Sequence, residues 1–98
     1  MSAYVLVDVD VHDPVAFARY RELGVPTIAA HGGRVLARSD DVVTLEGNWS
    51  PRRIVVLEFD DLEAARRWHA SSEYQAAREL RLSAANTQSI ALAALPAS

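Results

Sequence analysis

The fold is decided by the segment Ala3-Tyr4-Val5-Leu6-Val7-Asp8-Val9-Asp10-Val11. Its odd positions hold alanine or valine, and its even positions hold larger or charged residues. A period of two with many β-branched residues predicts a strand that buries one face in a core. The even positions, from Tyr4 to Asp10, should then lie on the opposite face of a sheet.

The residues that follow predict a helix interrupted by a proline. Asp13 is a suitable N-cap, and Pro14 suits the first helical position. Apolar residues recur at helical spacing over residues 17–30. Because Pro26 cannot donate a backbone hydrogen bond, the helix is expected to kink or break near residues 23–25.

The rest of the chain completes a β-α-β-β-α-β order within a single domain, residues 1–98. The expected elements are a strand at 34–38 with Val35 and Ala37 on one face, extended chain at 42–46, a central strand at 53–59, a helix from Asp60 or Asp61 that restarts at 71–73, and a strand at 87–92. This order predicts the α+β class and the ferredoxin-like split βαβ plan, an antiparallel sheet with its helices on one face.

The uncovered face of that sheet predicts a homodimer. It should carry aliphatic side chains that are unfavourable in water, and the packing of two sheets would cover them. These residues are Tyr4, Leu6, Leu36, Ile54, Val56 and Ile90 or Leu92. Asp8 and Asp10 share the face, so they are expected to pair with Arg34, Arg38 or Arg53.

Composition excludes several classes of function. The formal charge of −3 argues against nucleic acid, which demands a basic face. No run is long enough to cross a membrane and no signal peptide is visible, so we expect a cytoplasmic protein. The chain has no cysteine, and all ten basic residues are arginine, so thiolate and Schiff-base chemistry are excluded.

The sequence contains no motif for a metal or a cofactor, and we expect neither. It lacks a Gly-x-Gly-x-x-Gly segment, a phosphate loop and a Gly-x-Ser-x-Gly nucleophile turn. Its three histidines are scattered, without the spacing of a metal site. His31 is expected to cap the first helix, where the helix dipole favours a cation.

The loop between the second and third strands holds the first candidate site. Glu46 and Arg53 flank it, and their positions allow an ion pair across the two strands. They either close the loop or frame the mouth of a pocket, with Arg53 as an anion clamp. Trp49 must pack on its own domain, on a second subunit or on a ligand. We expect the second subunit.

A second group of candidates lies on the helices. His69, near the break in the second helix, is either a general base or an exposed residue at a helix end. Tyr20, Trp68 and Tyr74 are either core residues or the wall of a ligand cavity beside the first helix.

Several motifs, in order and spacing, resemble those of the domain of unknown function 1330 family, within the dimeric α+β barrel superfamily. They are Gly32-Gly33-Arg34-Val35-Leu36-Ala37-Arg38, the Leu-Glu-Gly-x-Trp motif at 45–49, Glu63-Ala64-Ala65-Arg66-Arg67-Trp68, and Ser71, Glu73, Tyr74 and Gln75. The superfamily also holds muconolactone isomerase-like and antibiotic-biosynthesis monooxygenase-like proteins. The resemblance implies a cofactor-independent enzyme acting on a small organic molecule. A non-catalytic ligand-binding or assembly module is the alternative.

Overall fold

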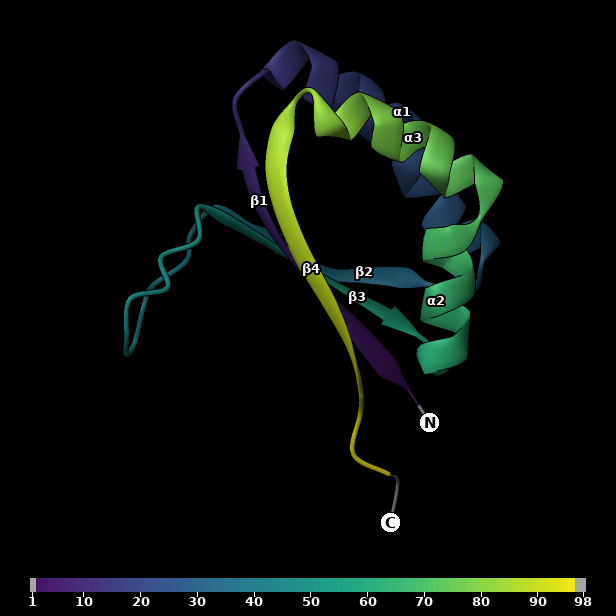
Figure 1. Cartoon of the computed structure of the whole chain (residues 1–98). Coiled ribbons are helices and arrows are strands. Elements are labelled where there is room, and N and C mark those ends of the chain that lie inside the picture. Colours follow the sequence, from purple (N-terminus) through teal and green to yellow (C-terminus); the bar gives the residue numbers. More distant parts are fainter. Residues whose placement is uncertain (1, 97–98) are drawn as a thin grey trace.

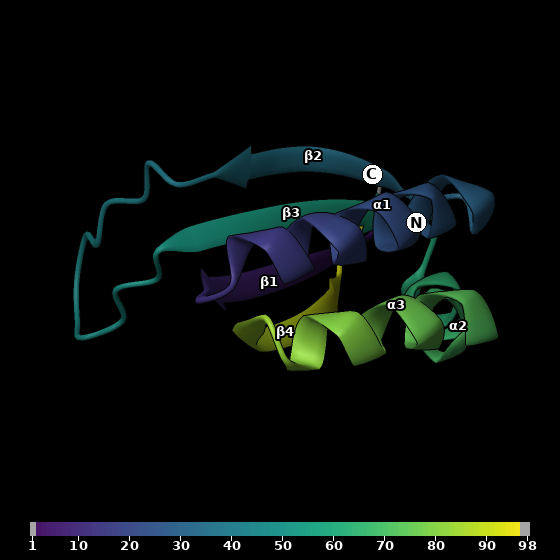
Figure 2. The ribbon, with the colours of Figure 1, turned by 90° about the horizontal axis from the view of Figure 1, so that it is seen from above.

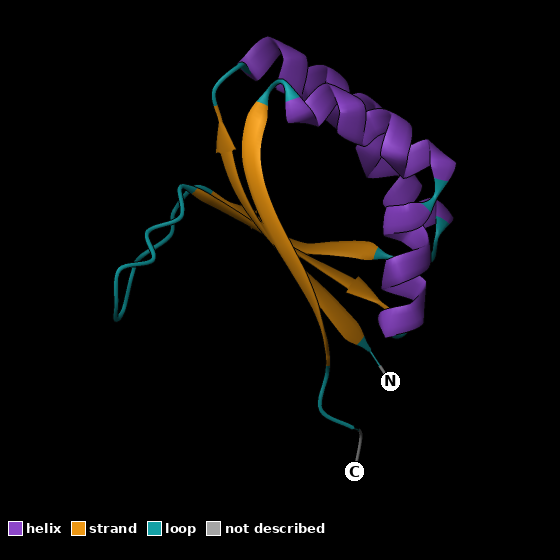
Figure 3. Cartoon of the chain, in the orientation of Figure 1, coloured by secondary structure: helices purple, strands orange, loops and turns teal. Residues whose placement is uncertain are grey.

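The computed structural model describes residues 2–96 as one antiparallel sheet with its helices on one face (Figures 1 and 3). The elements are β1 (Ala3–Val11), α1 (Pro14–Ala30), β2 (Arg34–Ser39), β3 (Arg53–Phe59), α2 (Leu62–Ala70), α3 (Ser72–Leu82) and β4 (Ala85–Ala93). The predicted α+β, ferredoxin-like order is confirmed, including the division of the second helix. No helix within these residues combines the length and apolar character that a membrane crossing requires.

The strands lie in the order β2-β3-β1-β4, which places β3 inside the sheet as expected, together with β1. The alternation predicted for β1 is present, since Val5 and Val9 are buried and Asp10 is exposed. The inner face packs on the helices around Leu57 and Phe59, which are almost inaccessible to solvent.

A β-bulge in β2 changes which of its residues face the helices. Val35 is paired with Leu57, but Ala37 is paired with Val56 and Arg38 with Val55. The extra residue makes the strand lose its simple alternation. The prediction that Val35 and Ala37 share a face is therefore wrong, and Arg38 lies on the inner face instead.

Helix α1 runs unbroken through Pro26 to Ala30, so the predicted break is wrong. Asp13 caps its start, and the side chain accepts a hydrogen bond from the amide of Ala16. Near the other end Thr27 and Ile28 are buried, and Trp68 Nε1 donates to Thr27 Oγ1 at 2.9 Å. This packing holds the last turns in place and offsets the one bond that the proline removes.

A single serine joins α2 to α3 and orients two aromatic residues. Ser71 has an extended backbone, so it ends one helix and caps the next. Its hydroxyl donates to the carbonyl of Trp68 at 2.7 Å and accepts from the amide of Tyr74 at 3.2 Å. Both rings therefore project into the space between the helices and the sheet, where their centroids lie 4.3 Å apart.

A long loop, residues 40–52, joins β2 to β3 and extends away from the sheet (Figures 1 and 2). It contains no strand, so the extended segment expected at 42–46 is not part of the sheet. The hairpin closes instead at Ser39, which is paired with Ile54. Leu45 is almost fully exposed in this loop.

Candidate functional site

A cavity of about 60 Å³ lies between the inner face of the sheet and the helices. The structure brings Tyr20, Trp68 and Tyr74 together around it. The remaining wall consists of aliphatic residues, Phe17 and four arginines. These are Val7, Val9, Val25, Ile28, Val35, Val55, Leu57, Arg21, Arg38, Arg53 and Arg81.

Two tyrosines and one arginine form a hydrogen-bonded network in the cavity wall. The hydroxyls of Tyr20, on α1, and Tyr74, on α3, lie 3.0 Å apart. Arg81, on the same face of α3 and about two turns further along, donates from Nη1 to Tyr74 Oη at 3.0 Å. Gly24 leaves room for the ring of Tyr20 in this position, because a Cβ at residue 24 would lie only 3.2 Å from that ring.

Burial raises the pKa of Tyr20 well above its usual value, and the neighbouring Tyr74 adds to the effect. The phenol therefore keeps its proton at neutral pH. It can donate a hydrogen bond to a ligand oxygen, but it is not a base under these conditions.

Arg53 belongs to the cavity but not to the ion pair that the sequence suggested. It donates two hydrogen bonds to Asp40, from Nε at 2.6 Å and from Nη2 at 3.2 Å. Its guanidinium also lies 5.9 Å from the ring centroid of Phe17. The hairpin register places Asp40 beside Arg53, whereas Glu46 lies out in the exposed loop. The predicted Glu46–Arg53 pair is therefore wrong.

Trp49 lies on the outer face of its own sheet, on the side away from the cavity. Nε1 donates to Asp8 at 2.9 Å, and the ring borders a hollow lined by Leu6, Ile54 and Ile90. The side chain remains 61% exposed. Asp10 contacts Arg52 at 3.6 Å. Neither Asp8 nor Asp10 has the arginine partner that was expected. The loop supplies their partners instead, and Arg34 is paired with Glu58.

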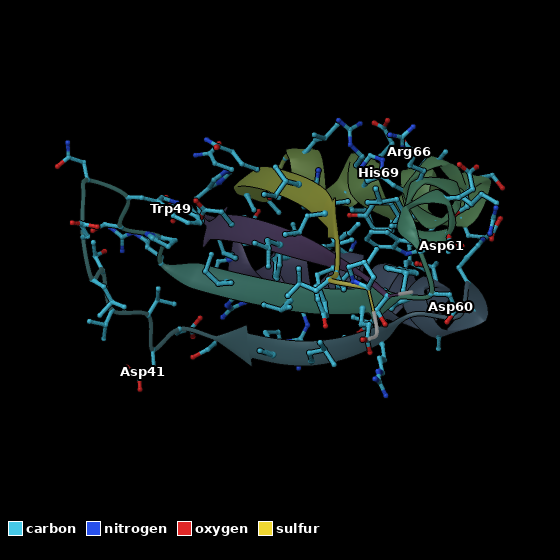
Figure 4. All side chains as sticks on the ribbon, turned by 90° about the horizontal axis from the view of Figure 1, so that it is seen from below. Asp41, Trp49, Asp60, Asp61, Arg66 and His69 are labelled. Carbon is cyan, nitrogen blue, oxygen red and sulfur yellow. The ribbon has the colours of Figure 1, made fainter. Side chains whose placement is uncertain are left out.

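His69 lies outside the cavity, at the opposite end of the molecule from Trp49 (Figure 4). Its ring packs against Tyr74 and Trp68, with centroids 5.4 and 6.1 Å apart. Partial burial lowers its pKa, and the charges of Arg78 and Arg81 lower it further. The ring is thus neutral at pH 7, but it lines a separate surface hollow.

His31 caps α1 as predicted. Its Nδ1 lies 3.0 Å from the carbonyl oxygen of Thr27, and Nε2 lies 3.7 Å from Glu73. Within residues 2–96, no three histidine or acidic side chains are grouped closely enough to hold a metal ion.

Sequence reasoning missed three arginines of the cavity. Arg81 could have been found, because Tyr74, Ala77 and Arg81 follow helical spacing and all three are buried. An arginine on an apolar stripe is an unusual feature. Arg38 could not have been assigned, since the bulge that turns it inward has no clear signal in the sequence.

With its split βαβ sheet and the cavity under its helices, this protein falls in the class of ferredoxin-like α+β proteins. The chain belongs to the family described as Domain of unknown function (DUF1330), whose model matches residues 2–95. No curated protein matches its sequence.

Solved structures show the same fold at low sequence identity. A protein of unknown function from Rhodopseudomonas palustris has 19% identity and a TM-score of 0.77, over 98% of this chain and 84% of that one. SnoaB, a cofactor-independent oxygenase from Streptomyces nogalater, has 14% identity and a TM-score of 0.66, over 98% and 95%. A dimeric protein of unknown function with a ferredoxin-like fold, from Bacteroides fragilis, has 12% identity and a TM-score of 0.59, over 94% and 95%.

Proposed function

We propose that the protein binds a small organic molecule in the helix–sheet cavity and acts on it as an enzyme without a resident cofactor. The observation that carries this proposal is the convergence of polar groups in an otherwise apolar cavity. An apolar wall with a few fixed polar groups is the usual design of a small-molecule site. The description of SnoaB as a cofactor-independent oxygenase supports the class of activity by analogy of fold.

The cavity residues suit the stabilisation of negative charge on a substrate oxygen. One phenolic O–H of the Tyr20–Tyr74 pair can donate to that oxygen, and the guanidinium of Arg81 lies directly behind the pair. Fixed donors in a dry site stabilise a developing oxyanion strongly. An enolate formed in this way can be reprotonated at another carbon, which is isomerisation, or can react with molecular oxygen, which would be the oxidant of an oxygenation. Among the described residues, no carboxylate or histidine lines the cavity, so a water molecule or the substrate itself would accept the proton.

Among the described residues, the wall holds no side chain that could act as a general base, and this favours one second candidate, a non-catalytic ligand-binding module. A metabolite screen by thermal shift, followed by analysis of each ligand after incubation, separates the two. For an enzyme, the wild type converts its ligand, whereas Tyr20→Phe still binds the ligand but converts it at least tenfold more slowly, roughly the effect of one oxyanion donor. Tyr4→Phe, on the outer face, is the matched control and should convert at the wild-type rate. Ligands recovered unchanged throughout would favour the binding module.

We also propose that two copies pair through the outer sheet faces. This face carries exposed or half-exposed apolar residues in a continuous area: Leu6, Leu36, Ile54, Val56, Ile90 and Leu92. Pairing would remove them from water. The Bacteroides fragilis protein of the same fold is described as dimeric, which supports self-association.

A further inference from the structure

Among the residues that the structure describes, the wall of the cavity contains four arginines and no acidic residue. Arg53 is compensated by Asp40. Among residues 2–96, Arg21, Arg38 and Arg81 form no salt bridge with any carboxylate. The cavity is therefore a positively charged region in a protein whose formal net charge is −3.

In two of these arginines, a buried guanidinium nitrogen has no hydrogen-bond partner among the described residues. Arg81 is only 7% exposed, and its Nε is buried without a hydrogen-bond partner among the described residues. The Nε atom of Arg21 is buried in the same way. A buried cation without a counter-charge is unfavourable, so an anion in the cavity would be strongly attracted.

The tyrosine pair adds a donor that the chain itself leaves unused. The two hydroxyls hold two protons, and one of them forms the bond between the rings. Arg81 can only donate, so it occupies a lone pair of Tyr74 and accepts nothing. One phenolic O–H therefore has no acceptor among the described residues, and it is available to donate to a ligand.

From the uncompensated arginines and the free O–H, we infer that the ligand is a small carboxylic acid with a short, flat apolar body. This inference rests on the proposed function, because it specifies the substrate class of the same cavity. The carboxylate would supply both the missing negative charge and the missing acceptor. The apolar body suits the rings of Phe17, Tyr20 and Trp68, and a volume of about 60 Å³ limits the buried part to a few heavy atoms.

Crotonate and crotonamide are the probes, because they have nearly the same shape and differ in charge. Binding to the wild-type protein is measured by thermal shift and by titration calorimetry in a buffer of constant ionic strength. We expect crotonate to raise the melting temperature and to bind at least tenfold more tightly than crotonamide, since a charged hydrogen bond is stronger than a neutral one.

Arg21→Gln and Arg38→Gln test the cavity arginines without disturbing the buried Arg81. Each should weaken crotonate binding about tenfold and leave the thermal stability of the free protein nearly unchanged. Arg19→Gln is the matched control, because Arg19 lies on the same helix as Arg21 but is exposed and does not line the cavity. It should bind crotonate like the wild type.

The outcomes separate this inference from the proposed function. If both probes bind equally, or if the two cavity variants bind crotonate normally, the ligand is not an acid held by these arginines. Binding of crotonamide alone would leave the cavity as a ligand site and still overturn the inference. If neither probe binds at tens of millimolar, the inference is wrong, whereas the proposed function fails only if the metabolite screen also finds no ligand.

Discussion

At the scale of single residues, the hydroxyl of Tyr74 links α1, α3 and the cavity. It meets Tyr20 Oη and accepts from the buried Arg81. Tyr74→Phe removes the only acceptor that Arg81 Nη1 has among the described residues. We expect a loss of about 2–3 kcal/mol in the free energy of unfolding, because a buried charged donor is left without a partner.

Tyr20→Phe is the comparison for this prediction, since it removes the other hydroxyl and leaves the Arg81–Tyr74 bond in place. Its loss should be about 1 kcal/mol, the net value of one hydrogen bond between neutral groups. Urea denaturation of both variants measures the difference. Equal losses would mean that Arg81 finds another acceptor.

His69 should contribute to acid sensitivity. Its pKa in the folded protein lies below the ordinary value of 6.5. The folded state therefore binds its proton less readily than the unfolded state, so its contribution to stability is full above pH 6.5 and is lost as the pH falls through the folded pKa. His69→Gln should lose less stability than the wild type between pH 7 and pH 5, as measured by denaturant unfolding at each pH. Parallel curves for the two proteins would contradict this.

The aromatic part of the candidate site could be predicted from the sequence, and the charged part could not. Tyr20, Trp68 and Tyr74 stand at helical spacing in apolar stripes, which locates them between the helices and the sheet. The inward position of Arg38 depends on the bulge in β2, and the burial of Arg81 depends on how closely α3 packs against the rest of the protein. Both features are set by tertiary packing. The Glu46–Arg53 pairing failed because it assumed a short hairpin loop.

At the scale of elements, the turn between α1 and β2 depends on close packing against the core. A Cβ on Gly33 would lie 2.5 Å from the ring of Phe59, which is fully buried and packs on Trp68. Gly33→Ala should therefore cost about 1–3 kcal/mol through overpacking.

Gly32→Ala separates this packing effect from backbone strain. Gly32 has a φ of +78° and open space around its Cα, so an alanine there costs only the left-handed conformation, about 1–2 kcal/mol. Circular dichroism melts in the two variants provide the test, together with the near-ultraviolet signal of Trp68. An unchanged tryptophan signal in Gly33→Ala would show that the ring of Phe59 does not move.

Element positions followed the sequence where periodicity was strong, and departed from it where packing decided. The strict alternation of β1 predicted its strand, and of the two caps proposed for the second helix, Asp60 and Asp61, the structure uses Asp61. Pro26 did not break α1, because Thr27 and Ile28 are buried beyond it and keep the last turns in place. The unfavourable helix propensity of Pro26 concerns one backbone hydrogen bond, whereas the packing beyond it involves several side chains at once.

At the scale of the whole molecule, the outer sheet face should control assembly. Ile90 lies on this face opposite Leu6 and is 62% exposed in the single chain. Ile90→Arg would bury an unpaired charge between two sheets, so it should convert the expected dimer to a monomer at micromolar concentration. Sedimentation velocity measures the change.

Leu23→Arg is the control for the assembly prediction. Leu23 is an exposed apolar residue of similar size, but it lies on α1, away from the outer face. This variant should sediment like the wild type. A wild-type protein that sediments as a monomer would rule out pairing through the sheet, as would an Ile90→Arg variant that remains dimeric.

The bulge in β2 has a consequence for how such proteins diversify. Because one extra residue separates Val35 from Ala37, Arg38 lies on the inner face although the pleat alone would turn it outward. Loss of the codon for Leu36 would restore the pleat and leave Ala37, Arg38 and Ser39 paired as they are, so the arginine would stay on the inner face. Relatives could therefore lose the bulge through a one-residue deletion and still keep the cationic group in the cavity.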